Sequence, residues 1–142
     1  MSLLPAFWDS SALIPLCVQQ NQTERATALF ADHGVVVWWS TPIEIVSGLT
    51  RLLRMREIGP DDFQAGKQLA QIIARTWRLV EPSEQIAHQA RVLLELYPLS
   101  AADAAQLAAA LEWCEGNPKG DVFLTFDQRL REAAGLAGFT LE

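Results

Sequence analysis

The chain has 142 residues, of which 50% are hydrophobic and 20% are charged, a composition typical of one soluble globular domain and not of a disordered protein. Its two cysteines and two histidines lack zinc-ligand spacing, which argues against a zinc site. The formal net charge of -6 opposes non-specific binding to nucleic acid, except where carboxylates surround bound cations.

The first eight residues are apolar, but they lack the basic start and the long apolar run of a secretory signal. No later stretch is apolar over the length that a membrane-spanning helix needs. We therefore expect a cytoplasmic protein that does not associate with a membrane.

Short apolar runs rich in Val, Phe and Trp predict buried strands at 3–8, 35–39, 77–80, 122–126 and 139–141. Helical periodicity predicts helices at 10–19, 23–31, 42–55, 61–76, 83–97, 101–114 and 128–135. Strands that alternate with helices predict a parallel sheet, and continuously apolar strands predict helices on both of its faces. The sequence thus predicts one α/β domain over residues 1–142, a three-layer α/β/α sandwich with a central parallel sheet.

Two prolines conflict with these elements. Pro5 lies within the first predicted strand and Pro15 within the first predicted helix, and each removes a backbone donor. We expect the element boundaries to be least certain there.

Four acids fall at junctions between the predicted elements. Asp9 directly follows the first strand and Asp127 directly follows the fourth, while Glu44 follows the second strand by a short turn. Asp103 opens a helix after the break at Pro98. Because the carboxyl ends of parallel strands form one edge, and ligands bind outside that edge, we expect these acids to lie together.

Helix capping is the alternative explanation for each acid taken alone. Thr41 with Glu44, and Ser100 with Asp103, match the spacing of a capping box, and Asp9 and Asp127 are suitable N-caps. Capping does not, however, require a buried strand to precede the acid. The repeated strand-then-acid placement therefore favours a shared site, with Thr41 also predicted to cap its helix.

A cluster of this kind has a specific chemistry. Carboxylate oxygens are hard ligands that suit Mg²⁺ or Mn²⁺. Such ions lower the pKa of a bound water and stabilise charge on a phosphodiester. The sequence therefore predicts metal-dependent phosphodiester chemistry at this edge of the sheet.

At these residues the chain resembles the PIN domains, and in particular the toxin nucleases of bacterial and archaeal VapBC toxin–antitoxin pairs. The resemblance spans the chain and rests on Phe7-Trp8-Asp9-Ser10-Ser11-Ala12-Leu13, Ile43-Glu44, Leu99-Ser100-Ala101-Ala102-Asp103-Ala104-Ala105-Gln106-Leu107-Ala108 and Phe123-Leu124-Thr125-Phe126-Asp127-Gln128-Arg129-Leu130.

The resemblance implies a PIN-like fold, cleavage of RNA with Mg²⁺ or Mn²⁺, a homodimer and inhibition by an antitoxin protein. By position, it implies that Asp9, Glu44, Asp103 and Asp127 are the catalytic and metal-holding acids, with Asp9 and Asp103 as the principal ligands. It further implies that the hydroxyls of Thr125 and Ser11 lie beside them.

Three arginines are candidate contacts for RNA phosphates: Arg51 and Arg54 near the end of the helix that begins at Glu44, and Arg129 just after Asp127. The alternative is a solvated helix end, since cations also suit a helix carboxyl terminus.

Two competing functions stay open. The first is a catalytically silent PIN-like module that binds RNA or protein. The second is another α/β phosphate-handling protein. A haloacid-dehalogenase-like phosphatase, however, usually has a second Asp two residues after its nucleophile, where this chain has Ser11. A response-regulator receiver has an acidic pair before a phosphorylated Asp and a late Lys, and this sequence fits that pattern equally poorly.

Overall fold

The computed structural model describes residues 3–142, and its centre is a five-stranded sheet. The strands are β1 (Leu4–Trp8), β2 (His33–Trp38), β3 (Arg78–Val80), β4 (Val122–Leu124) and β5 (Thr140–Leu141). They run in the spatial order β3-β2-β1-β4-β5, and every neighbouring pair is parallel. The predicted parallel sheet is confirmed.

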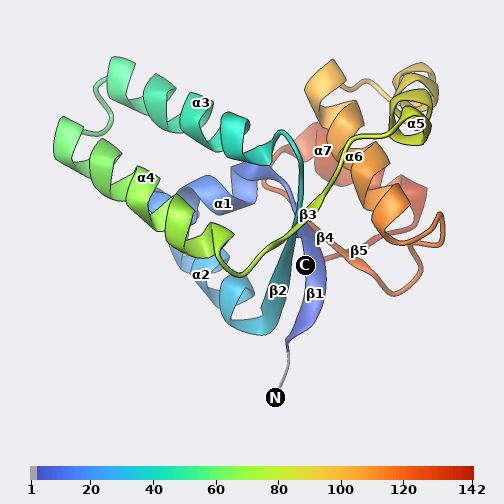
Figure 1. Ribbon diagram of the computed structural model, residues 1–142, viewed down its shortest axis with the longest axis horizontal. Coiled ribbons are helices and arrows are strands. Elements are labelled where there is room, and N and C mark those ends of the chain that lie inside the picture. The colour runs from blue at the N-terminus through green and yellow to red at the C-terminus, as the bar shows by residue number, and fades with distance from the viewer. Residues whose placement is uncertain (1–2) are drawn as a thin grey trace.

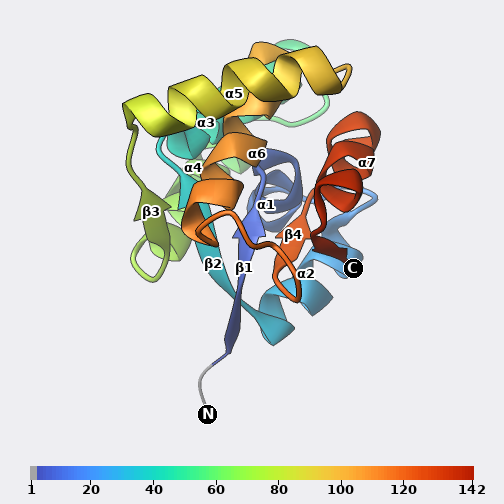
Figure 2. The same cartoon turned by 90° about the vertical axis from the view of Figure 1, so that its right-hand side faces the viewer.

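Helices cover both faces of this sheet (Figures 1 and 2). One group consists of α1 (Ser10–Cys17), α2 (Thr23–Asp32), α3 (Thr41–Arg54) and α4 (Pro60–Ala74). The other consists of α5 (Glu84–Leu96), α6 (Ala101–Trp113) and α7 (Gln128–Ala137). The predicted α/β/α sandwich is therefore correct, and no helix within residues 3–142 is long and apolar enough to cross a bilayer.

The core divides into two clusters because successive strand residues point to opposite faces. Phe7 and Phe123, both fully buried and stacked at 5.4 Å, belong to the cluster under α5, α6 and α7. Trp8 and Leu124 belong to the cluster under α1–α4. The two apolar layers hold the carboxyl ends of β1 and β4 rigidly side by side.

Both prolines are accommodated at positions that limit their cost. Pro5 pairs with Gly34 of β2, but the pairing of β1 with β4 starts only at Ala6. Pro5 thus lies before the part of β1 that is paired on both sides. Pro15 is buried inside α1, a helix that ends only two residues later, and its carbonyl accepts a hydrogen bond from Thr23 Oγ1 at 2.6 Å.

β4 ends at Leu124, two residues before the predicted end of this strand. Beyond it, side chains take over the backbone donors. Phe126 N donates to Ser11 Oγ at 2.9 Å, and Asp127 N donates to Thr125 Oγ1 at 3.0 Å. Hydroxyl groups thus replace the neighbouring strand as acceptors where the chain leaves the sheet, and the Thr125 hydroxyl contacts Asp9 and Ser11, which follow β1.

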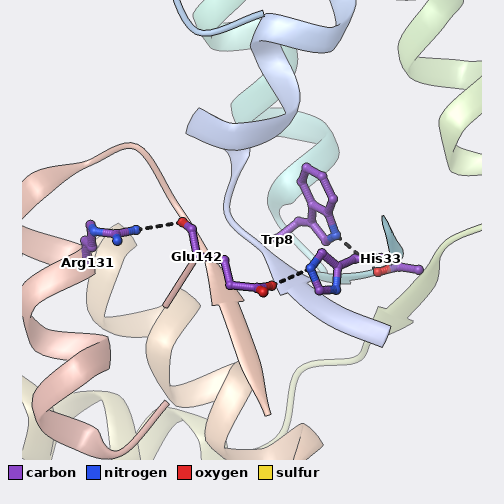
Figure 3. Close-up of polar contacts among 5 residues, drawn as sticks. Trp8, His33, Arg131 and Glu142 are labelled. Carbon is purple, nitrogen blue, oxygen red and sulfur yellow. Dashed lines mark hydrogen bonds and ion pairs between the residues drawn. The ribbon is translucent and has the colours of Figure 1, made fainter. Parts of the chain in front are cut away.

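The last residues are joined to the start of β2 (Figure 3). Glu142 Oε2 lies 2.5 Å from His33 Nε2, and the Glu142 carbonyl accepts a hydrogen bond from Arg131 Nη1 at 3.0 Å. Trp8 Nε1 donates to the Gly34 carbonyl at 3.1 Å on the same side of the sheet. The two contacts of Glu142 fix the chain end after β5, together with α7, against His33, at the opposite end of β2 from its carboxyl end.

Candidate functional site

Asp9 is the most deeply buried of the four predicted acids, with 3% of its surface exposed. Its backbone N–H donates to the Leu124 carbonyl at 2.9 Å, which fixes it between β1 and β4. Its Oδ2 accepts hydrogen bonds from Ser11 Oγ at 2.7 Å and from Thr125 Oγ1 at 2.9 Å. Although Asp9 occupies the N-cap position of α1, its side chain makes no capping bond, so capping does not explain this residue.

Glu44 lies in the first turn of α3 and is held by side chains from three parts of the chain. Its carboxylate accepts hydrogen bonds from Ser10 Oγ at 3.3 Å, from Ser40 Oγ at 2.5 Å and from Gln106 Nε2 at 3.1 Å. The predicted capping role of Thr41 is wrong. Ser40 takes the N-cap position, although its side chain accepts no bond from a backbone N–H of the helix, and the buried Thr41 hydroxyl instead accepts from Gln106 Nε2 at 3.3 Å.

Asp103 occupies the third position of α6, and the predicted cap at Ser100 is present. Ser100 Oγ accepts a hydrogen bond from Asp103 N at 3.1 Å. Burial raises the pKa of the partly exposed Asp103 carboxyl to about 6, and the charges of Asp9, Asp127 and Glu44 add to the rise while Ser100 opposes it. The influence of all three acids on one carboxyl indicates that the four lie in one electrostatic neighbourhood.

Asp127 does cap its helix. Its Oδ1 accepts a hydrogen bond from Leu130 N at 2.9 Å at the start of α7. Capping uses only one carboxylate oxygen, and the charge still raises the pKa of Asp103. Asp127 therefore combines a structural bond with a place beside the other acids.

The cluster is short of positive charge. Burial raises the pKa of Asp9, the hydroxyls of Ser11 and Thr125 lower it, and the nearby Glu44 raises it further. Within residues 3–142 the only close contact between an acidic and a basic side chain joins Glu142 to His33, so no lysine or arginine neutralises the four acids directly. Their mutual repulsion favours protonation or a bound cation.

A hard divalent cation fits this donor set, although no ready-made cage exists. Among residues 3–142, no group of three or more acidic, histidine or cysteine side chains is arranged to hold a metal ion. Mg²⁺ typically binds through one or two carboxylates and keeps several waters, so it does not require such a group. The donors are all oxygen atoms. Burial raises the pKa of Asp9 and Asp103, the charges of neighbouring acids add to the rise, and a cation would offset both effects.

Gln106 is a part of this neighbourhood that the sequence analysis did not identify. It is completely buried, and its amide nitrogen reaches both Glu44 and Thr41. The available signal was a single polar residue inside the otherwise apolar run Ala104–Ala110 of α6. A polar residue at a core position indicates a specific partner.

Among residues 3–142, none of the three predicted RNA-contacting arginines forms an ion pair with the four acids. Arg51 and Arg54 are exposed in the last turn of α3, two to three turns from Glu44, about 10–15 Å along the helix axis. Arg129 is exposed on α7 beside a small surface pocket that includes Tyr97 and Pro98. Their part in RNA binding stays a prediction.

The family model of the PIN domain matches residues 6–136. The chain belongs to the PIN domain family. Its match includes all four predicted acids, and no curated protein sequence matches the chain significantly.

Solved structures resemble this PIN domain over most of its length. VapC20 of Mycobacterium tuberculosis, a toxin that cleaves the sarcin–ricin loop, has a TM-score of 0.66 at 20% identity, covering 95% of this chain and 96% of that one. FitAcB from Neisseria gonorrhoeae has a TM-score of 0.67 at 18% identity, with coverages of 95% and 96%. A toxin–antitoxin complex from Klebsiella pneumoniae has a TM-score of 0.56 at 20% identity, with coverages of 79% and 82%. At these identities the likeness establishes the shared fold.

Proposed function

We propose that this PIN domain is an endoribonuclease that hydrolyses RNA phosphodiesters with Mg²⁺ or Mn²⁺, and that it is the toxin of a toxin–antitoxin pair. The observation that carries the proposal is the buried Asp9 carboxylate, held by two hydroxyls and influenced by Glu44, with no basic residue from positions 3–142 paired to it. Removing such a buried charge, or pairing it with a basic residue, would make the folded state more stable, so stability alone does not explain it. Structural likeness to a sarcin–ricin-loop-cleaving toxin supports RNA as the substrate.

The contacts of the four acids indicate which of them bind the ion directly and which act through water. Asp9 and Asp103 are the principal ligands, because Asp9 is fixed in place and the Asp103 carboxylate is partly exposed at the start of α6. Glu44 and Asp127, each already engaged in hydrogen bonds, act through water. When bound, the divalent ion supplies an activated water and neutralises charge on the phosphodiester.

Thr125 and Ser11 orient the central ligand. Their hydroxyls lie 3.0 Å apart, and both contact Asp9 Oδ2. This leaves Oδ1 without a side-chain donor in the described part of the chain. Positioned hydroxyls of this kind reduce the rotation of a carboxylate before a ligand binds.

We further propose that Arg51, Arg54 and Arg129 bind RNA phosphates outside the site and that the chain forms a homodimer inhibited by an antitoxin protein. The net charge of -6 makes such local basic groups necessary for RNA approach. The resemblance of the fold to one component of a toxin–antitoxin complex supports a protein partner.

The test is cleavage of RNA by the purified, antitoxin-free chain in Mn²⁺, compared with Asp9→Asn and Asp103→Asn. We expect each variant to lose at least about 100-fold in rate, because each loses a carboxylate ligand to the ion that activates water. EDTA should abolish the wild-type activity. Asp62→Asn is the matched control, since Asp62 holds the same third helical position in α4 as Asp103 holds in α6 but is exposed.

Equal residual activity in the wild type and both variants would refute the assigned site. The second candidate, a catalytically silent PIN-like module that binds RNA or protein, is favoured by the lack of a three-residue metal group in residues 3–142. That module predicts RNA binding without cleavage at any Mn²⁺ concentration, and binding that is unchanged by Asp9→Asn.

A further inference from the structure

The carboxamide of Gln106 lies fully buried between two helices that cover opposite faces of the sheet. Gln106 is on α6, three residues after Asp103, so the two side chains share one face of that helix. Its Nε2 lies 3.1 Å from both carboxylate oxygens of Glu44, on α3, and 3.3 Å from Thr41 Oγ1. In Figures 1 and 2, α3 and α6 belong to the two separate helical layers. Gln106 therefore connects the layers above the carboxyl edge of the sheet.

The orientation of this amide is decided by charge. A carboxylate accepts hydrogen bonds, so the nitrogen must face Glu44 and the oxygen must point away. The consequence is that Gln106 Oε1, although buried, has no hydrogen-bond partner among residues 3–142. An unpaired buried acceptor is unfavourable, and an apolar side chain of the same size would avoid it. Stability alone thus does not explain a glutamine at this core position.

The donors to Glu44 share a further property. Ser10, Ser40 and Gln106 are all neutral, so they fix the carboxylate without cancelling its charge. A lysine or arginine in place of Gln106 would hold Glu44 equally well but would compete with a bound cation. A neutral clamp preserves the negative charge that such a cation needs.

We propose that Gln106 is a positioning residue that holds the Glu44 carboxylate toward the divalent ion and couples α3 to the helix that carries Asp103. This inference rests on the proposed metal-dependent function, because it concerns the ion of that same site. Gln106 touches neither the ion nor the RNA in this role. Its effect passes entirely through Glu44.

The experiment measures Mn²⁺ binding by calorimetry to the purified full chain, without RNA. Gln106→Met removes the donor while nearly preserving side-chain volume, and we expect the dissociation constant to rise about tenfold, as for removal of an outer-shell partner of a metal ligand. In a Glu44→Ala background the same substitution should change the dissociation constant less than twofold, because the residue through which it acts is gone. Gln89→Leu, a partly buried glutamine of α5 that lines a surface pocket near Glu112, is the matched control.

A merely structural role gives a different result. It predicts that Gln106→Met weakens Mn²⁺ binding equally in both backgrounds, or leaves it unchanged, and either outcome overturns the inference. Should Gln106→Met lower the Tm by more than about 5 °C, Gln106→Asn decides the question. Asn keeps the amide but is one methylene too short to reach Glu44. We therefore expect Gln106→Asn to weaken Mn²⁺ binding about tenfold when Glu44 is present and less than twofold in the Glu44→Ala background.

The two proposals fail in different ways. Wild-type protein that binds no Mn²⁺ and cleaves no RNA would refute the metal-dependent function and the positioning role with it. Wild-type protein that binds Mn²⁺ through Asp9, but shows no coupling between positions 106 and 44, would refute the positioning role alone.

Discussion

Two regions of this sheet differ in what surrounds their acidic side chains. At the start of β2, Glu142 lies against the imidazole of His33, and its main-chain carbonyl is bonded to Arg131 (Figure 3). At the carboxyl ends of β1, β2 and β4, the charges of neighbouring acids add to the rise in the pKa of Asp9 and Asp103. The groups that contact the four acids are hydroxyls, an amide and backbone N–H groups.

The difference shows which region serves stability. In the first region the acid is exposed and lies against an imidazole, so it costs the fold little free energy. In the second region burial, and after it the charges of neighbouring acids, raise the pKa of Asp9 and Asp103, which destabilises the fold at neutral pH. Perturbed acids of this kind are typical of functional sites, although ion-pair networks also produce them.

The largest expected effect is stabilisation of the acidic edge by a cation. At a Mn²⁺ concentration 100-fold above its dissociation constant, the free energy of unfolding of the wild type should rise by about 2.7 kcal/mol. Urea unfolding with Mn²⁺ and with EDTA measures the difference. The gain should vanish in the Asp9→Asn, Asp103→Asn double variant and persist in Asp62→Asn. An equal gain in the double variant would place the ion elsewhere.

Next in size is the loss of the hydroxyls that hold Asp9. Thr125→Val should lower the free energy of unfolding by about 2 kcal/mol, because it leaves Asp9 with one hydroxyl donor and Asp127 N without its acceptor. The measurement is urea unfolding at pH 7.

The control for that substitution is Thr140→Val, at an exposed residue of β5, which should change the free energy by less than about 0.5 kcal/mol. Equal small losses in both variants would show that Asp9 is held by the strands and not by Thr125.

A smaller effect, of opposite sign, is expected at Asp103. Its pKa is about 6 in the folded chain and near 3.8 in an unfolded one, so the native state binds more protons between these values. The free energy of unfolding in EDTA should therefore fall as the pH rises from 4 to 6 and stay low above 6. Asp103→Asn should flatten this contribution and stabilise the chain at pH 7 by about 1 kcal/mol, after allowance for solvent screening of a partly exposed group.

Asp62→Asn again supplies the control, because first-turn acids normally favour a helix. It should destabilise the chain slightly, by about 0.5 kcal/mol, and leave the pH dependence unchanged. Destabilisation by Asp103→Asn at pH 7 would show that capping and not repulsion dominates at this position.

The sequence predicted which strands and helices occur, and their succession along the chain, because each has a clear apolar periodicity. The boundaries shifted where side chains compete with backbone partners, as at Thr125, whose hydroxyl ends β4 earlier than the apolar run suggests. Local propensity does not include acceptors from distant parts of the chain, such as Ser11 at this point.

The candidate site shows the same division. The four acids were visible because each follows a strand or opens a helix, which is a local pattern. Gln106 was not, since its partners Glu44 and Thr41 are more than 60 positions away and belong to the other helical layer. The capping prediction for Thr41 failed for the same reason, because a distant amide occupies its hydroxyl.

The smallest expected effect lies in the paired region. Glu142→Gln removes the charge beside His33 but keeps the main-chain carbonyl that Arg131 contacts, so it isolates the contact between Glu142 and His33. Glu142 is exposed, and exposed pairs contribute little, so the free energy of unfolding should fall by less than about 1 kcal/mol. RNA cleavage and the Mn²⁺ dissociation constant should stay within twofold of the wild type, because the pair lies at the start of β2 and the acids lie at the carboxyl ends of the strands. A tenfold change in either would mean that the two regions are energetically coupled through the sheet. The region around Glu142 could then no longer be assigned a role in stability alone.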